Sequence, residues 1–180
     1  MTAGKHAQKA VRAAAKPPRP TIGWREWVHL PGLLDQPIKA KIDTGARTSA
    51  IHAFHIREFI ADGVRRVEFR LHPLQRRKTP EVRCVADIHD ERVITSSNGQ
   101  RDRRFVILVD VAVGATRWPI ELTLADRDQM GFRMLLGREA LRRRFLVDPG
   151  RSYRQSERRP GSVARNPAPA RTTPNTPRFA

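Results

Sequence analysis

Short apolar runs separated by polar or turn residues make up the middle of this 180-residue chain. Runs of this length predict mostly β-strands, because helices need longer apolar stripes of 3.6-residue period. The expected strands span residues 22–28, 37–42, 50–54, 64–71, 82–88, 92–95, 103–113 and 118–124. One helix is expected from Arg138 to Phe145, followed by an extended segment over residues 146–148. The pattern therefore predicts a mainly β fold, a small closed barrel with one C-terminal helix.

Two turns stand out between these strands. Ser97, Asn98 and Gly99 lie between Val93 and Phe105, and Asn-Gly tolerates the positive φ that a tight hairpin needs. Gly114 marks a second turn, between the apolar runs 105–113 and 118–124. The sequence therefore predicts two hairpins in the second half of the domain, and no internal repeat is visible.

The positive charge is concentrated at the two ends of the chain. The net charge is +17, and residues 1–20 and 154–180 are rich in Lys, Arg, Ala and Pro but poor in large apolar residues. Such segments cannot bury enough apolar surface to offset the entropy of ordering, so both are expected to be disordered tails. The remaining residues, 21–153, are expected to form one domain.

Targeting and redox signals favour a cytoplasmic location. The N-terminal segment has no apolar signal-peptide region, and no run approaches the roughly 18 apolar residues typical of a membrane span. Cys84 is the only cysteine, which excludes an intrachain disulfide and suits a reducing compartment. We therefore expect a cytoplasmic protein without a membrane partner.

The sequence Asp43-Thr44-Gly45 carries the most informative chemistry. An apolar-flanked strand, residues 38–42, delivers one carboxylate to a turn built from Thr and Gly, as in an aspartic peptidase. Ala46 follows and lacks a hydroxyl that could hydrogen-bond the carboxylate, which favours a working range nearer neutral pH. Asp and Gly are also ordinary turn residues, so this motif alone leaves a structural role open.

A second motif strengthens the catalytic interpretation. Some ninety residues downstream, Met134-Leu135-Leu136-Gly137-Arg138 combines a buried apolar strand, a Gly and a helix opening with Arg. With these two motifs the chain resembles the retropepsin-like aspartic peptidases, and more closely the bacterial family labelled "ATP-dependent zinc protease" that is associated with RimK-type glutamate ligases. The matching stretches are residues 41–53, 96–99, 103–106, 120–127, Met130, 134–138 and 145–149, within residues 21–153.

The resemblance assigns roles to particular residues. It implies that Asp43 is the catalytic acid, that Thr44 and Gly45 complete its loop, and that Gly137 belongs to the supporting strand together with Arg138. It also implies an acid-protease type of barrel. The hairpin of Ser97, Asn98 and Gly99 would act as a flap that closes over the substrate.

The family label itself finds little support in the residues. No Gly-x4-Gly-Lys-Ser/Thr loop for ATP and no His-Glu-x-x-His helix for zinc is present. His52 and His55 are the nearest zinc candidates, but at strand spacing they point to opposite faces. We therefore expect no cofactor and expect His52 to pack near the catalytic loop or to shape the substrate cleft. A zinc-dependent hydrolase remains an alternative.

Aspartic catalysis needs a second carboxylate, because two acids must share one proton. A two-fold axis through the site would supply Asp43 of a second copy, which predicts a homodimer. Asp126 is the best candidate for a second acid within the chain, but an ion pair with Arg127 that holds a loop is the interpretation that we favour for it.

The basic charge suggests two kinds of partner. The association with glutamate ligases favours an acidic or glutamate-rich peptide substrate, and Arg47, just past the catalytic loop, would pair with a substrate carboxylate. In the alternative, the chain is a non-catalytic β-domain whose basic tails bind RNA, the ribosome or an acidic partner. The two hypotheses differ in whether Asp43 is required.

Overall fold

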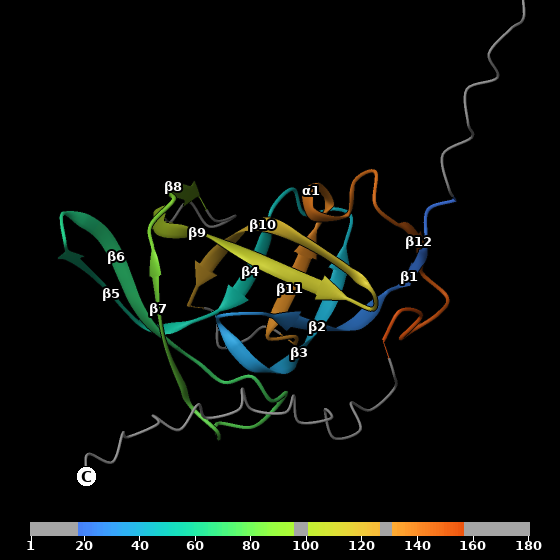
Figure 1. Ribbon diagram of the computed structural model, residues 1–180, viewed down its shortest axis with the longest axis horizontal. Coiled ribbons are helices and arrows are strands. Elements are labelled where there is room, and N and C mark those ends of the chain that lie inside the picture. Colours follow the sequence, from blue (N-terminus) through green and yellow to red (C-terminus); the bar gives the residue numbers. More distant parts are fainter. Residues whose placement is uncertain (1–17, 96–100, 127–130, 157–180) are drawn as a thin grey trace, which may run out of the picture.

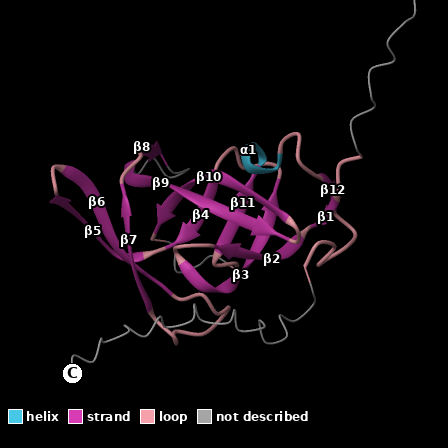
Figure 2. Ribbon diagram, in the orientation of Figure 1, coloured by secondary structure: helices cyan, strands magenta, loops and turns pink. Residues whose placement is uncertain are grey.

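The computed structural model describes residues 18–95, 101–126 and 131–156, which are mostly β-structure (Figures 1 and 2). The strands are β1 Thr21–Gly23, β2 Arg25–Leu30, β3 Leu34–Asp43, β4 Ser49–His52, β5 Phe54–Ala61, β6 Val64–Leu71, β7 Val82–Asp87, β8 Asp90–Thr95, β9 Arg101–Val113, β10 Thr116–Ala125, β11 Met134–Gly137 and β12 Leu146–Asp148. A single helical turn, α1, spans Arg138–Leu141.

Six of the strands close into a barrel. They are hydrogen-bonded in the order β10-β4-β11-β3-β2-β9, and β9 pairs back with β10 to complete the ring. Strand β8 extends the sheet beside β9, while β5, β6 and β7 form a separate three-stranded sheet at one side of the barrel (Figure 1). The predicted closed β-barrel with one helix is confirmed.

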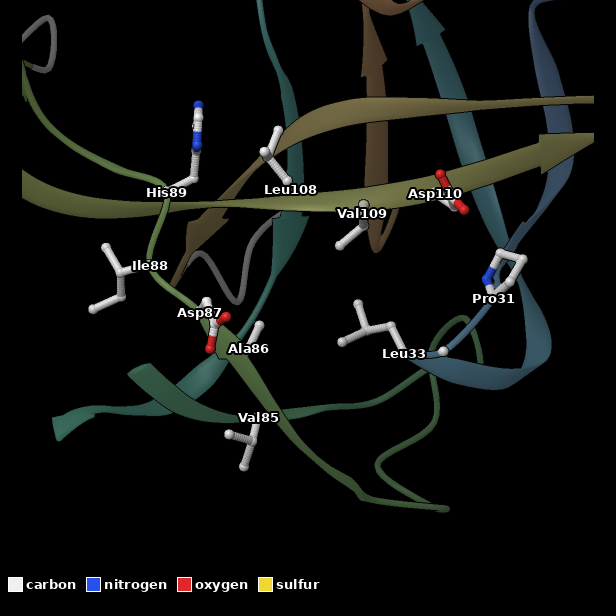
Figure 3. A pocket seen from close by; sticks show the side chains of 11 residues that line it. Pro31, Leu33, Val85, Ala86, Asp87, Ile88, His89, Leu108, Val109 and Asp110 are labelled. Carbon is white, nitrogen blue, oxygen red and sulfur yellow. The ribbon is translucent and has the colours of Figure 1, made fainter. Parts of the chain in front are cut away.

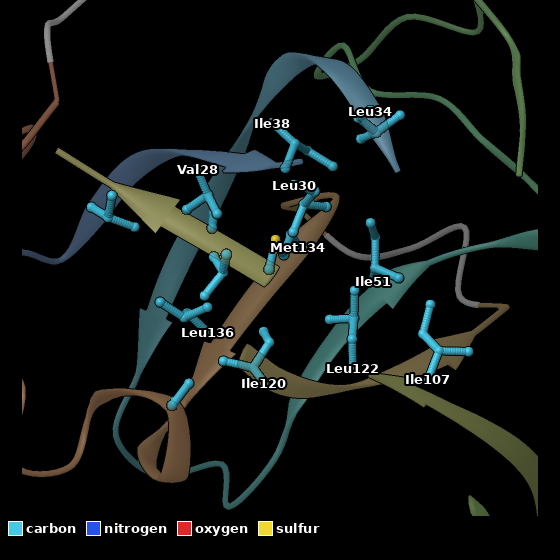
Figure 4. Close-up of a cluster of buried hydrophobic side chains, with 14 of the residues drawn as sticks. Val28, Leu30, Leu34, Ile38, Ile51, Ile107, Ile120, Leu122, Met134 and Leu136 are labelled. Carbon is cyan, nitrogen blue, oxygen red and sulfur yellow. The ribbon is translucent and has the colours of Figure 1, made fainter. Parts of the chain in front are cut away.

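The barrel interior is filled by alternate residues of each strand. In β3, for example, Ile38, Ala40 and Ile42 are buried while the residues between them reach the outer face. Figure 4 shows Val28, Leu30, Ile51, Leu122, Met134 and Leu136 meeting in this core. Burying a side chain of this size contributes about 1.5–3 kcal/mol, so the core holds the strands that frame the site.

Two predicted elements differ from the observed ones, and one observed strand was not predicted. The expected strand 22–28 divides at Trp24, whose N–H donates to the carbonyl of Arg151 instead of a barrel neighbour. Strand β5 was not predicted, because its residues are partly exposed on both faces and give no clear alternation. The helix ends four residues early, since Arg142 leaves helical geometry and Arg143 adopts a positive φ of 65°.

The described chain is secured at its C-terminal end by a buried carboxylate. Glu26 is fully buried and accepts hydrogen bonds from the backbone N–H groups of Arg154, Gln155 and Ser156. Most residues of the two predicted tails lie outside the described ranges. Within those ranges, none of the helical structure is long and apolar enough to cross a bilayer.

Candidate active site

Strand β3 ends in a tight loop that holds the Asp43 carboxylate. Oδ1 of Asp43 accepts hydrogen bonds from the N–H groups of Gly45 and Ala46, at 3.2 and 3.1 Å. Oδ2 lies 3.5 Å from Nζ of Lys41, the neighbouring residue on the same face of the strand. The Asp43 side chain is 26% exposed, and Thr44 and Gly45 are exposed as well. One carboxylate oxygen is therefore anchored by the backbone, beside a loop that is open to solvent.

Strand β11 lies directly beside this loop. It runs parallel to β3, with Gly137 opposite Asp43, and antiparallel to β4. A Cβ atom on Gly137 would lie only 2.4 Å from the carbonyl oxygen of Thr48, so no larger residue fits without moving the backbone. The N–H of Gly137 donates to Oγ of Ser49 at 3.1 Å. The downstream motif thus meets the Asp-Thr-Gly motif in space.

The start of α1 fixes the far side of the loop. The N–H groups of Arg138 and Glu139 donate to the carbonyl oxygens of Ala46 and Arg47, at 2.8 and 3.1 Å. Nη1 of Arg138 also reaches the carbonyl oxygen of Thr44 at 3.2 Å. Arg47, predicted to meet a substrate carboxylate, is paired with Glu139 through an Nε–Oε1 contact of 2.7 Å. The loop is therefore held by contacts from both β11 and α1.

Asp126 lies at the other end of the sheet from Asp43. It follows Ala125, which is opposite His52, and the N–H of His52 donates to the carbonyl oxygen of Arg133. Arg133 and Gly137 are four residues apart, which is about 13 Å along an extended strand. Asp126 and Asp43 are thus separated by the length of β11 and do not form a carboxylate pair.

Three imidazoles gather near Asp126 around one aromatic ring. Phe54 stacks on His72 with ring centroids 4.4 Å apart, and the rings of His52 and His55 lie 6.1 and 5.3 Å from that of Phe54. Burial, and next the charge of Arg133, lower the pKa of His72. In the part of the chain described, no group of three His, Cys, Asp or Glu residues is placed to hold a metal ion. His52 lies at the end of β4 farther from the Asp43 loop.

The hairpin that we predicted to act as a flap has its two strands in place. Strands β8 and β9 pair antiparallel from Asp90–Val106 to Thr95–Arg101, whereas Ser97, Asn98 and Gly99 lie outside the described residues. The second predicted turn, at Gly114, joins β9 to β10 with a φ of 57°.

A large groove lies away from Asp43, between β7, the β2–β3 turn and β9 (Figure 3). Its volume is about 600 Å³, and apolar side chains and polar groups both line its walls. The two carboxylates at its edge are already paired, Asp87 with Arg66 at 3.0 Å and Asp110 with Arg117 at 2.7 Å. Leu33 in its wall precedes the end of β3 that lies opposite Asp43, so the groove is separate from the Asp43 loop.

Sequence reasoning missed three residues of the site. These residues look like ordinary polar residues in the sequence. They are Lys41, whose ammonium lies near the Asp43 carboxylate, Ser49, which accepts a hydrogen bond from Gly137, and Glu139, which pairs with Arg47. Lys41 carries a usable signal, since it is two residues from Asp43 on the same strand face. Ser49 and Glu139 become visible only with the pairing of β11 against β3 and β4.

Comparisons with known proteins agree with this geometry. A family model described as "Retropepsin-like aspartic endopeptidase RimB" matches residues 21–158. A protein of Shewanella pealeana is 48% identical over 132 residues, covering 73% of this chain and 29% of that protein. One of Parasynechococcus marenigrum is 42% identical over 159 residues, covering 88% and 34%. Both are named "Probable alpha-L-glutamate ligase", and the chain spans about a third of their length.

A solved structure shares the fold. The protein Lpg0085 of Legionella pneumophila, described as having unknown function (DUF785), superimposes with a TM-score of 0.65 at 24% sequence identity. The superposition covers 76% of this chain and 98% of that one. At this identity the likeness concerns the fold alone.

Proposed function

Because the chain belongs to the RimB-like family of retropepsin-like aspartic endopeptidases, we propose that it hydrolyses peptide bonds with Asp43 as its catalytic acid. The presentation of the Asp43 carboxylate carries this proposal. The N–H groups of Gly45 and Ala46 anchor Oδ1, and the side chain remains partly exposed. A carboxylate held in this way is suited to bind a water molecule and to accept its proton.

The second carboxylate comes from a second copy of the chain. Asp126 is at the wrong end of β11 to share a proton with Asp43. Thr44 and Gly45 are exposed at the end of a closed barrel, where a two-fold related loop has access to them. In the proposed homodimer each loop supplies one acid, and the axis passes between the two Asp43 side chains.

Hydrolysis then follows from two carboxylates that share one proton. The ionised carboxylate takes a proton from water while the water oxygen forms a bond to the scissile carbonyl carbon. The protonated carboxylate gives its proton to the carbonyl oxygen, which produces a tetrahedral diol. The C–N bond then breaks as a proton passes to the leaving amine. One water is consumed, a carboxylic acid and an amine are released, and no cofactor takes part.

Acidic or glutamate-tailed proteins are the substrates we propose. The net charge of +17 attracts anionic chains and raises their rate of encounter. The curated relatives are named as glutamate ligases, which connects this domain with polypeptides that carry added glutamate. A peptidase specific for such chains would reverse or trim the ligated product.

Peptide cleavage by single-residue variants tests the catalytic assignment. Wild type, Asp43→Asn and Asp126→Asn are incubated with peptides that carry or lack a C-terminal run of glutamates, and products are identified by mass spectrometry. We expect wild type and Asp126→Asn to cleave the glutamate-tailed peptide and Asp43→Asn to lose at least a thousandfold in rate. Undiminished cleavage by folded Asp43→Asn would refute the proposal.

Mixing the two proteins tests the shared site. Wild type and Asp43→Asn are combined in equal amounts, allowed to exchange subunits, and assayed at constant total concentration. If only wild-type pairs are active, the rate falls to roughly a quarter of that of wild type alone, because random exchange gives one such pair in four. A rate of one half would mean that each chain works independently.

A further inference from the structure

The face of β3 that carries Asp43 continues as a row of cations. Lys39 and Lys41 alternate with buried residues and therefore share the outer face with Asp43. Across the sheet, Arg25 of β2 lies opposite Lys41, and Trp27 lies opposite Lys39. Residues in register on paired strands lie on the same face, so Arg25 extends this cationic surface toward the edge of β2.

At the end of this row the surface deepens into a pocket of about 360 Å³. Lys39, Arg25 and Arg76 supply its charge, and Trp24 and Phe132 supply an aromatic wall, with their ring centroids 5.8 Å apart in an edge-to-face contact. No carboxylate lines it in the part of the chain that the structure describes. It is a cationic pocket with an apolar wall.

The cations of this pocket lack the carboxylate partners that several arginines elsewhere in the described chain possess. On the three-stranded sheet and the barrel, Arg66, Arg83 and Arg117 each lie within 3.0 Å of a carboxylate oxygen. Within the described ranges, Lys39 and Arg76 form no ion pair, and the ammonium of Lys39 lies 5.2 Å from the centre of the Trp27 ring. The guanidinium of Arg25 contacts the hydroxyl of Ser152 and the rings of Trp24 and Tyr153. Uncompensated positive charge beside a low-dielectric wall attracts an anion more strongly than the same charge in open solvent.

A lining residue also presents an unused acceptor. Gln75 donates through Nε2 to the carbonyl oxygen of Gly131, which ties together two loops of the pocket. Its Oε1 is buried and has no hydrogen-bond partner among the described residues. A buried acceptor without a donor is costly, so this part of the pocket wall has an unsatisfied polar atom just beneath its surface.

We infer that this pocket is a subsite for the carboxylate side chain of an acidic peptide that lies along β3 toward Asp43. The inference rests on the proposed peptidase function. Lys39 and Asp43 are four residues apart on β3, about 13 Å, which an extended peptide spans with about four residues. The side chain held by the pocket therefore lies about four residues from the bond that is cut. The cations Lys39, Arg25 and Arg76 select it by charge.

The pocket fits a carboxylate better than a nucleotide. The Arg25 guanidinium covers one face of the Trp24 ring at 4.5 Å, and Phe132 meets that ring edge-on. This leaves little flat aromatic surface on which a base could stack, and stacking is the contact that single-stranded nucleic acids use most.

Binding to a catalytically silent protein tests the subsite. In the Asp43→Asn background, the Kd of a fluorescein-labelled hexaglutamate peptide is measured by fluorescence anisotropy, with hexaglutamine and a six-nucleotide RNA as comparison probes. Lys39→Gln and Arg76→Gln are compared with Arg142→Gln, which removes an exposed charge outside the pocket. Thermal unfolding confirms that each variant is folded.

We expect each pocket variant to raise the Kd for hexaglutamate about tenfold, because each removes one charge-assisted hydrogen bond to the peptide. Arg142→Gln should leave the Kd within about twofold, and hexaglutamine should bind at least tenfold more weakly than hexaglutamate. Equal binding of the two peptides, equal effects of the three variants, or tighter binding of the RNA would overturn the inference.

The same variants in the wild-type background separate this inference from the proposed function. If the subsite is correct, Lys39→Gln and Arg76→Gln raise the KM for a glutamate-tailed peptide while kcat changes little, because they contact substrate far from the reacting bond. If Asp43→Asn abolishes cleavage but neither pocket variant changes KM, the subsite is rejected and the peptidase function stands. Charge-dependent binding without any cleavage would reject the peptidase alone.

Discussion

Gly137→Ala is the substitution whose effect the structure defines most sharply. The new Cβ would lie 2.4 Å from the carbonyl oxygen and 2.5 Å from the carbonyl carbon of Thr48. Carbon and oxygen atoms normally approach no closer than about 3.3 Å, so the backbone at Thr48 must move by about 1 Å. Overpacking of this kind costs about 1–3 kcal/mol. Weakening the bond from the Gly137 N–H to Ser49 adds about 1 kcal/mol.

The expected loss in free energy of unfolding is therefore about 2–4 kcal/mol. Gly131→Ala is a matched control, because nothing lies within 4 Å of its added Cβ and its φ is not in the left-handed region. That variant should be neutral or more stable by up to about 1 kcal/mol. Both are measured by urea unfolding at one protein concentration, since dimer formation would make stability depend on concentration.

The same displacement should affect catalysis. Thr48 and Arg47 continue the loop that holds Asp43, and a shift of about 1 Å in a catalytic group can cost about a hundredfold in rate. Stability of Gly137→Ala within about 0.5 kcal/mol of Gly131→Ala would show that the loop yields freely, which would refute the view of a fixed support under Asp43.

Three further predictions concern buried groups. Glu26→Gln should lower the free energy of unfolding by about 3 kcal/mol in urea, because an amide N–H₂ would face the backbone donors of residues 154–156. Burial raises the pKa of Cys84 to about 11, so its reaction with a disulfide reagent at pH 8 should be about a hundredfold slower in native protein than in urea. Burial and the charge of Arg133 lower the pKa of His72. The unfolded chain therefore binds this proton more readily than the folded chain does. The free energy of unfolding should fall as the pH drops below about 6.5, and the fall should be smaller in His72→Gln.

The strands could be predicted where one face is buried and the other is not. Strand β6 spans its predicted residues, Val64–Leu71, because buried and exposed side chains alternate along its second half. Strand β5 was hidden because its side chains are half-exposed on both faces of a small sheet. The helix was overextended because Phe145 is buried, which suggested a longer apolar stripe, although Arg143 has already left helical geometry.

The candidate site could be predicted where its chemistry is local. Asp43 and Gly45 form a turn whose hydrogen bonds connect residues two and three apart, and a local pattern of this kind is visible in the sequence. The contact of Gly137 with Thr48 depends on the register of β11 between β3 and β4. The cationic pocket depends in addition on a loop near residue 76, which no spacing in the sequence connects with Lys39.

The rigidity of the Asp43 loop bears on how the second acid would be supplied. The loop is held by the hydrogen bond from the Ala46 N–H to the Asp43 carboxylate. In addition, the backbone N–H of Arg138 donates to the carbonyl oxygen of Ala46, and its guanidinium donates to the carbonyl oxygen of Thr44. A loop fixed in this way loses little conformational entropy when a partner docks, so more of the contact energy is left for association. Asp126, beyond the far end of β11, would have to cross the sheet to reach the same place. In the proposed homodimer, a two-fold pairing of fixed loops would therefore complete the site at lower cost than a rearrangement within one chain.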